Sequence, residues 1–225
     1  MPHPADDTLR LLDRVSFLAP LPAASRQALA ALARPQRLAE ARPLFRRGDP
    51  GEGMILVLDG LVRLHLTSAA GRELTLGLAG QGEPVGELAL IDGGPRSADA
   101  TTLTPVSLLL FRHAEAAPLI ERDGALAMAL LRMVVGRLRR TTDQVEAVGL
   151  QPLPQRLAGV LLRLAAADPA GLVRLPQGQI AALVAATRPK VNLALAELRR
   201  QGLLVPARAG LRLQDLAALR AIAEG

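Results

Sequence analysis

The sequence contains no cysteine, tryptophan or tyrosine, and it has only 3 phenylalanines among 225 residues. A chain without thiols forms no disulfides, performs no thiol catalysis, and holds neither a zinc finger nor a cysteine-ligated iron–sulfur cluster. RNA-binding sheets and single-strand grooves stack bases on aromatic rings, so the near absence of these rings argues against both. The function therefore has to rest on charged, polar and backbone groups.

Long apolar runs are missing as well. No stretch of 18 apolar residues occurs, and the opening segment MPHPADDTLR lacks the pattern of a signal peptide. We therefore expect a soluble, cytoplasmic protein with no membrane partner. Half of the residues are hydrophobic, and the length leaves room for two domains, each with its own core.

Catalytic constellations are also lacking. The chain offers no Ser/His/Asp set and no metal-ligand cluster, so we expect neither an enzyme nor a metal site. His65 and His113 could be considered as haem or metal ligands, but neither has a partner at ligand spacing. We favour a solvent-facing or hydrogen-bonded strand histidine at both positions.

Positive charge is in surplus. The net charge is +6 at pH 7, and Lys190 is the single lysine beside many arginines. A basic chain suits a polyanionic partner such as DNA. This signal is weak by itself, because a preference for arginine also follows from the base composition of a genome.

The most informative stretch is VGELALIDGGPRSA, residues 85–98. Glu87 stands nine positions before Arg96, glycines flank the core of the segment, and Ser97 and Ala98 follow the arginine. Successive backbone amides in such a loop form a concave nest for a phosphate, which an arginine closes with charge-assisted hydrogen bonds. A carboxylate accepts hydrogen bonds and suits a ribose hydroxyl. The combination predicts a nucleotide site.

The segments on either side of this stretch differ in pattern. Residues 8–39 are predicted to be helical, with Ser25 as an N-cap. Residues 40–112 carry short Leu- and Val-rich runs separated by glycine turns, which indicates a β-sandwich or roll. The run MILVLDGLVRLHL predicts two strands joined at Asp59-Gly60.

A long helix is predicted over residues 114–149, and the prolines of LQPLPQ, residues 150–155, predict a hinge after it. Mostly apolar residues recur along this helix at alternating spacings of three and four, at Leu131, Val134, Leu138, Thr141, Val145 and Val148. This pattern favours a coiled-coil seam in a homodimer over ordinary packing on the β-domain. Gly136 and the hydroxyls of Thr141 and Thr142 fit a pure zipper badly, and a ligand docked there would explain them.

Residues 156–225 are predicted to form a second domain. The helix RLAGVLLRLAAA, a short strand in LVRL and a short helix in 178–185 precede a turn at Ala186-Thr187. The helix RPKVNLALAELRRQG, a hairpin in LLVPARAGLRL and a last helix in DLAALRAIA follow. A helix-turn-helix followed by a hairpin is a winged DNA-binding domain.

Several polar residues of this domain are candidates for contacts with DNA. Arg188 and Lys190 lie in the first turn of the predicted recognition helix, and Asn192 follows, so all three are expected at base edges. The residues better placed for phosphates are Arg199, Arg200, Arg208 and Arg212.

On these segments the chain resembles the cAMP receptor protein/FNR family of bacterial transcription regulators. Residues 85–98 resemble the phosphate-binding cassette of cyclic-nucleotide-binding domains. The resemblance implies an α+β fold: an N-terminal helix and cyclic-nucleotide-binding β-roll (jelly roll) over residues 1–116, a dimerisation helix over 117–149, and a C-terminal winged helix-turn-helix domain over 150–225. It also implies cAMP as effector, without metal or iron–sulfur cluster, and double-stranded DNA, a second copy of the chain and RNA polymerase as partners.

The resemblance implies roles for single residues. Glu87 would bind the ribose hydroxyl and Arg96 with Ser97 the cyclic phosphate, while Thr141 and Thr142 would bond the adenine amino group, one from each subunit. The implied ligand-binding set is Gly86, Glu87, Leu88, Arg96, Ser97, Ala98, Leu64 and Leu76 on the purine side, Arg137, Thr141 and Thr142. The DNA-binding set is Thr187, Arg188, Lys190, Asn192, Arg199 and Arg208.

The recognition helix departs from the family pattern. Family members that bind the well-known half-site use Arg-Glu and a second Arg four residues after the Glu. Pro189 replaces that Glu and Leu193 the later Arg, so only Arg188 is kept and the target sequence does not carry over. Ala185 stands in the turn where glycine is common.

Three hypotheses about function stay open at this point. The leading one is a homodimeric, cAMP-responsive transcription regulator. The second keeps the DNA-binding function with another effector or none, since many family members keep the cassette as scaffold without binding cAMP. The third is a cyclic-nucleotide-binding module that acts on a protein partner.

Overall fold

The computed structural model describes residues 4–69, 71, 73–208 and 210–225. The chain separates into two compact units. The first comprises residues 1–72 and 76–140, and the second comprises residues 141–225 with 73–75. The predicted α+β fold, with an N-terminal β-domain, a long helix and a C-terminal winged helix-turn-helix, is confirmed.

The first unit opens with α1 (Pro4–Leu12) and α2 (Ala23–Leu32). The prediction of helix over residues 8–39 is wrong at its end, because β1 (Arg34–Leu38) is a strand that pairs antiparallel with the apolar strand β8. Ser25 is not the N-cap of α2 either, since Pro22 occupies that position. Ser25 is instead buried and hydrogen-bonds the Asp123 side chain.

The β-domain of the first unit contains two four-stranded sheets among the described residues, ordered β1-β8-β3-β6 and β2-β7-β4-β5. The strands are β2 (Pro43–Phe45), β3 (Gly53–Asp59), β4 (Val62–Thr67), β5 (Glu73–Ala79), β6 (Pro84–Val85), β7 (Asp99–Thr102) and β8 (Val106–Arg112). The predicted pair of strands joined at Asp59-Gly60 is confirmed as β3 and β4. Gly60 has a φ of +90°, which only glycine adopts readily.

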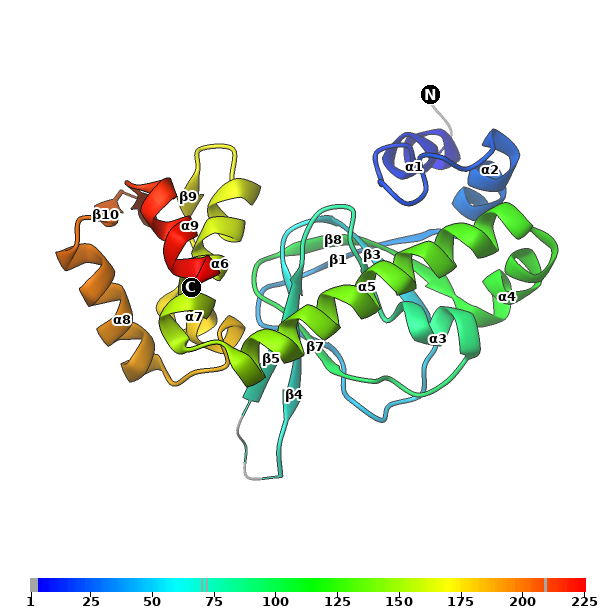
Figure 1. Cartoon of the computed structure of the whole chain (residues 1–225). Helices are drawn as coiled ribbons and strands as arrows, with labels where there is room; N and C mark the ends of the chain where they lie inside the picture. Colours follow the sequence, from blue (N-terminus) through cyan, green and yellow to red (C-terminus); the bar gives the residue numbers. More distant parts are fainter. Residues whose placement is uncertain (1–3, 70, 72, 209) are drawn as a thin grey trace. The chain divides into compact units, whose positions relative to one another are not determined.

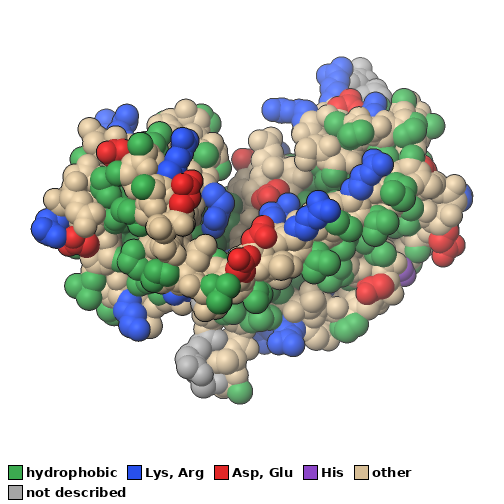
Figure 2. Space-filling view, in the orientation of Figure 1, with side chains coloured by type: hydrophobic (Ala, Val, Ile, Leu, Met, Phe, Trp, Pro, Cys, Tyr) green, Lys and Arg blue, Asp and Glu red, His purple; other side chains and the backbone are tan. Residues whose placement is uncertain are grey.

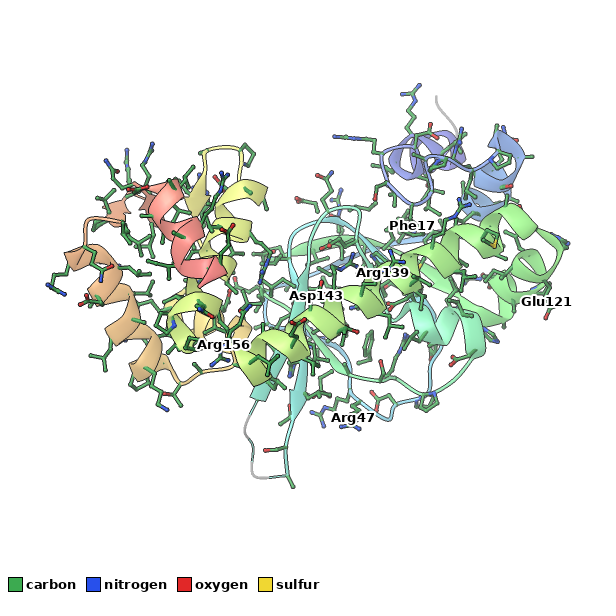
Figure 3. All side chains as sticks on the ribbon, viewed as in Figure 1. Phe17, Arg47, Glu121, Arg139, Asp143 and Arg156 are labelled. Atoms are coloured by element: carbon green, nitrogen blue, oxygen red, sulfur yellow. The ribbon has the colours of Figure 1, made fainter. Side chains whose placement is uncertain are left out.

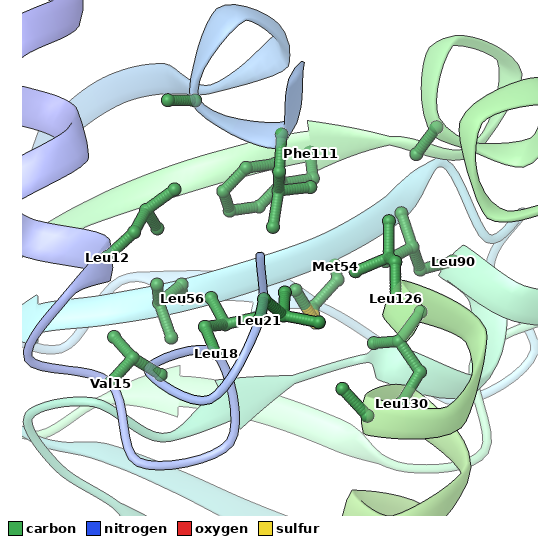
Figure 4. Packing of buried hydrophobic residues seen from close by; sticks show 14 of the residues in the cluster. Leu12, Val15, Leu18, Leu21, Met54, Leu56, Leu90, Phe111, Leu126 and Leu130 are labelled. Atoms are coloured by element: carbon green, nitrogen blue, oxygen red, sulfur yellow. The ribbon is translucent and has the colours of Figure 1, made fainter. Parts of the chain in front are cut away.

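The core of the first unit joins the N-terminal helices to the sheets (Figure 4). Side chains from the α1–α2 segment pack on β3, β8 and the first turn of the long helix. This cluster includes Leu12 and Leu18 from the segment, Met54 of β3, Phe111 of β8 and Leu126 of the long helix. Each of these is almost completely buried, which stabilises the fold by about 1.5–3 kcal/mol per side chain. A second cluster is formed by side chains of both sheets and contains Val57, Leu64, Val85 and Ala100.

Three further helices belong wholly or in part to this unit: α3 (Glu87–Asp92), α4 (His113–Arg122) and α5 (Gly124–Leu150). The prediction of one uninterrupted helix over residues 114–149 is wrong, because Asp123 separates α4 from α5. The Asp123 carboxylate accepts hydrogen bonds from Ser25 and from the amide of Leu126, 3.0 Å away, and these bonds lower its pKa. Asp123 thus begins a new helix. None of the described helices is long and apolar enough to cross a membrane.

The second unit consists of α6 (Leu153–Ala167), β9 (Leu172–Val173), α7 (Gln177–Leu183), α8 (Arg188–Arg200), β10 (Leu204–Ala207), β11 (Gly210–Leu213) and α9 (Leu216–Glu224). The long helix ends where the prolines of residues 150–155 predicted, since α5 ends at Leu150 and Pro152 precedes α6, whereas the two compact units divide earlier, between residues 140 and 141. Strands β10, β11 and β9 form one sheet, with the hairpin as the wing. Figure 1 shows α7 and α8 as successive helices beside it.

Backbone and side-chain hydrogen bonds hold the turn between α7 and α8. The amide of Ala186 donates to the carbonyl of Ala181 at 3.0 Å. Nη1 of Arg156, labelled in Figure 3, donates to the carbonyl of Val184 at 2.6 Å and so ties α6 to the turn. Ala185 adopts a φ of +50°, in the left-handed region that a Cβ disfavours.

The strain at Ala185 can be tested by thermal denaturation. We expect Ala185→Gly to raise the free energy of unfolding of this unit by about 0.5–1 kcal/mol, since the relief of left-handed strain exceeds the added chain entropy. The control is Ala186→Gly, at a neighbouring residue without positive φ, which should lower the same free energy. Equal effects of both changes would contradict the assignment of strain to residue 185.

Candidate functional site

The predicted nucleotide loop surrounds the short helix α3. Gly86, with a φ of +74°, is the N-cap of α3, and Gly93, with a φ of +64°, is its C-cap. The returning strand of the loop is fixed by two backbone bonds of 2.9 Å, from Arg96 N–H to the Asp49 carbonyl and from Gly48 N–H to the Arg96 carbonyl. The loop geometry therefore positions the Arg96 backbone before its side chain makes any contact.

The Arg96 side chain points into the protein and is only 7% exposed. Its Nη1 donates to the carbonyls of Gly53 and Gly86, and its guanidinium carbon lies 4.1 Å from the centre of the Phe45 ring. Burial lowers the pKa of Arg96, while the nearby carboxylates of Glu52, Asp49 and Glu87 oppose that shift. The guanidinium is thus a buried, oriented cation in the loop.

One donor of this cation is unsatisfied. Nε of Arg96 is enclosed and has no hydrogen-bond partner within the described part of the chain. A buried donor without a partner costs free energy, and arginine binds phosphate and carboxylate through several such donors at once. An anion that accepts from Nε would remove that cost, so the arrangement fits a bound phosphate.

Glu87 makes the second polar contact of the site. It is the first residue of α3, only 3% exposed, and its Oε2 lies 2.6 Å from Nη1 of Arg137 on α5. A buried carboxylate needs a cation or several hydrogen bonds to be tolerated. The family resemblance predicts that Glu87 and Arg137 both lie near one ligand. The direct hydrogen bond between the two side chains is seen only in the tertiary structure.

The remaining candidate ligand residues differ in exposure. Leu64 and Ala98 belong to the buried interior, with exposed fractions of 5% and 8%, whereas Leu76 and Leu88 are 38% and 40% exposed. Ser97, next to Arg96, is exposed. On α5, Thr141 and Thr142 follow Arg137 by about one turn and are both exposed.

The two histidines singled out in the sequence are hydrogen-bonded, as predicted, but only His65 lies on a strand, because His113 is the first residue of α4. Nε2 of His65 lies 3.2 Å from the Thr101 hydroxyl, and Nδ1 of His113 lies 2.8 Å from the Leu90 carbonyl. Nδ1 of His65 is also 3.6 Å from the Asp99 carboxylate, whose pKa is lowered mainly by a hydrogen bond from the Arg47 amide. Among the described residues, no group of three or more His, Asp or Glu side chains is arranged for a metal ion.

The candidate DNA-binding residues of α8 fall into exposed and half-buried groups. Arg188 and Lys190 are exposed in its first turn. Thr187 occupies the N-cap position of α8, but its hydroxyl makes no capping bond. Asn192 and Arg199 are half-buried, and the Oδ1 of the first and the Nε of the second are enclosed without a partner in the described structure.

Two further arginines differ in their freedom to reach phosphate. Arg208, at the end of β10, is exposed. Arg200 is held by Glu197 through two hydrogen bonds, Nε to Oε2 at 2.9 Å and Nη2 to Oε1 at 2.6 Å. The helical spacing of three residues is a signal for this pair that the sequence analysis did not use.

Both units match known domain families. Residues 35–123 match the cyclic nucleotide-binding domain, and residues 155–222 match the Crp-like helix-turn-helix domain. The fold and the site thus define a DNA-binding transcription regulator with a cyclic nucleotide-binding domain.

Individual proteins support the same assignment. The chain is 31% identical to the cyclic AMP receptor protein of Thermus thermophilus over 83% of its own length and 86% of that protein. It is 33% identical to a CRP-like cAMP-activated global transcriptional regulator of Mycobacterium tuberculosis, with coverage of 71% and 74%. The c-di-GMP responsive regulator CLP of Xanthomonas campestris shares its fold, with a TM-score of 0.74 at 23% identity, over 86% of this chain and 100% of CLP.

The chain belongs to the cAMP receptor protein/FNR family of bacterial transcription regulators. Proteins of this kind are transcription regulators and not enzymes, which agrees with the expectation from the sequence.

The close approach of Gly86 to Arg96 generates a stability prediction. A Cβ at residue 86 would lie 2.1 Å from Nη1 of Arg96, and the φ of +74° strains any side chain. We expect Gly86→Ala to lower the free energy of unfolding by about 2 kcal/mol or more. Gly77→Ala is the control, since nothing lies within 4 Å of its Cβ position. Equal melting temperatures for the two variants would contradict the packing described for Arg96.

Proposed function

We propose that this protein is a homodimeric, cAMP-responsive transcription regulator. The observation that carries the proposal is the buried Arg96, with its unsatisfied Nε, inside the loop of residues 86–98. The domains proposed are residues 1–116 for the effector, 117–149 for dimerisation and 150–225 for DNA. Relatives named for cAMP favour this effector.

In the proposed complex, Arg96 and Ser97 bind the cyclic phosphate within a loop that also contains Gly86, Leu88 and Ala98. Glu87 accepts a hydrogen bond from the ribose hydroxyl. Leu64 and Leu76 contact the purine, and Thr141 with Thr142 bond its amino group. Each of these contacts uses a group of matching chemistry: cation for anion, carboxylate for hydroxyl and hydroxyl for amine.

The Glu87–Arg137 pair offers a route from ligand to α5. A ribose hydroxyl that donates to Glu87 competes with or adds to the 2.6 Å hydrogen bond from Arg137. Because Arg137 lies on α5, a change in this bond alters a contact of the proposed dimerisation helix. Couplings of this kind typically amount to about 1–3 kcal/mol between two ligands.

The dimer rests on an apolar stripe along α5. Leu131, Val135, Leu138 and Val145 are 52%, 39%, 64% and 69% exposed. Figure 2 shows hydrophobic side chains at the surface along this helix. Val134 of the predicted seam is half-buried, and the side chain of Val148 lies outside the described residues. A second copy of α5 would bury the stripe.

Ligand binding then controls DNA binding. Two recognition helices of a dimer reach successive major grooves of a near-palindromic site. Arg188 and Lys190 face base edges, Asn192 is a further candidate, and Thr187, Arg199 and Arg208 serve the phosphates. RNA polymerase as a partner and the cytoplasm as location belong to the same proposal.

Calorimetric titration with cAMP tests the effector. We expect micromolar or tighter binding with one cAMP per subunit, and weaker binding of cGMP and cyclic di-GMP. Arg96→Leu should weaken cAMP binding roughly 100-fold or more, because a buried charge-assisted contact is lost. Arg37→Leu, at an exposed arginine of β1, is the control and should leave the affinity unchanged.

Absence of heat with every nucleotide would reject cAMP and favour the same regulator with another effector or none. Unchanged affinity in the Arg96 variant, with circular dichroism that matches the wild type, would reject the assigned site. The variants also need an intact fold, which the same spectra establish.

Sedimentation equilibrium tests the dimer. Leu138→Glu places two charges in the proposed seam, and we expect the dimer dissociation constant to rise roughly 100-fold or more. Leu216→Glu changes an exposed leucine of α9, 48% exposed, and should leave the association unchanged. A wild-type chain that sediments as a monomer, with or without cAMP, would refute the homodimer.

A further inference from the structure

The outward face of α8 is apolar at its centre. Pro189, Leu193 and Ala196 are all exposed and follow one another at spacings of four and three, which places them on one side of the helix. Leu193 is the most prominent, with 74% of its surface exposed. The opposite side supplies the core of the second unit through Val191, Leu195 and Leu198, each at most 4% exposed.

Charges border this apolar patch. Arg188 and Lys190 are exposed at its N-terminal end. Glu197 and Arg200, toward the C-terminal end, neutralise each other through their two hydrogen bonds of 2.9 and 2.6 Å. The patch thus combines an apolar centre with an excess of positive charge at the end of the helix that enters a major groove.

This combination matches a particular feature of DNA. The walls of the major groove carry phosphates, which suit the cations. Among the base edges on its floor, thymine alone carries a methyl group, at C5, whereas cytosine has only a hydrogen at that position and the purines present polar groups. A leucine has no hydrogen-bond donor or acceptor to offer, so its favourable base contact is with that methyl group.

We propose that Leu193 is a specificity-determining residue that contacts a thymine methyl group in each half of the DNA site. Pro189 and Ala196 keep the surrounding face of the helix apolar. Arg188 specifies the neighbouring base pair by hydrogen bonds to a guanine. The inference rests on the proposed DNA-binding function and adds the identity of one base pair, A·T, where Leu193 enters the groove.

The test begins with the full-length protein and a random duplex library, in the presence and in the absence of cAMP. Each thymine of the enriched site is then replaced, one at a time, by deoxyuridine, which removes only the C5-methyl group. Binding is measured by fluorescence anisotropy for the wild type, for Leu193→Ala and for the control Leu216→Ala. The control removes a leucine of α9 that is 48% exposed and far along the chain from α8.

We expect one position in each half-site at which deoxyuridine weakens wild-type binding about fourfold, the factor for burial of a single methyl-sized group. The Leu193→Ala variant should bind the thymine duplex and the deoxyuridine duplex with equal affinity. The Leu216→Ala variant should keep the fourfold difference in affinity. Leu193→Arg should exchange the preferred base at that position from thymine to guanine, because arginine pairs with the acceptors of guanine.

Two results would overturn the inference in distinguishable ways. An enriched site whose deoxyuridine duplexes all bind as well as thymine, or a methyl effect that survives in Leu193→Ala, rejects the role of Leu193 and leaves DNA binding intact. Failure to enrich any duplex in either condition rejects the proposed function itself. The apolar face would then fit a protein partner in place of DNA.

Discussion

The ion pair between the buried Glu87 and the half-buried Arg137 is the polar contact that connects the candidate loop to the long helix of the first unit. Glu87 is 3% exposed, so its carboxylate cannot rely on water and requires the guanidinium 2.6 Å away. This bond links α3, which the glycine turns of the loop position, to α5, which carries the exposed apolar stripe. The candidate ligand site and the proposed dimerisation helix are therefore connected by one pair of charges.

Arg96 has a comparable double role. It bonds the carbonyls of Gly53 and Gly86 and stacks on Phe45, so it holds β2, β3 and the loop together. Its Nε has no hydrogen-bond partner in the described residues. A residue that is both part of the fold and incompletely satisfied is suited to a site that tightens when an anion binds. The second unit has its own hydrophobic core. The outward face of α8 in this unit is apolar at its centre and positively charged at its N-terminal end.

Much of this organisation could be predicted from the chain. The strand pair at Asp59-Gly60, the break at Pro152 and the helix-turn-helix with its wing follow from local turn chemistry and periodicity, which act over a few residues. The errors share a cause. Residues 34–38 form a strand because they pair with β8, which is about 70 positions away along the chain, and helix periodicity could not reveal that partner. At Asp123 the local signal for a helix start was present, but the long apolar periodicity on either side concealed it.

The sequence by itself determined the kind of chemistry available: one arginine and one glutamate in a glycine-framed loop, a basic recognition helix, and no thiols or metal-ligand clusters. These are properties of residue type and short spacing. Only the tertiary structure decided that Glu87 meets Arg137, 50 positions away, that Arg96 is buried against Phe45, and that Leu193 remains exposed. The reason is that burial and pairing depend on which distant segments pack together, and local sequence does not encode those contacts one at a time.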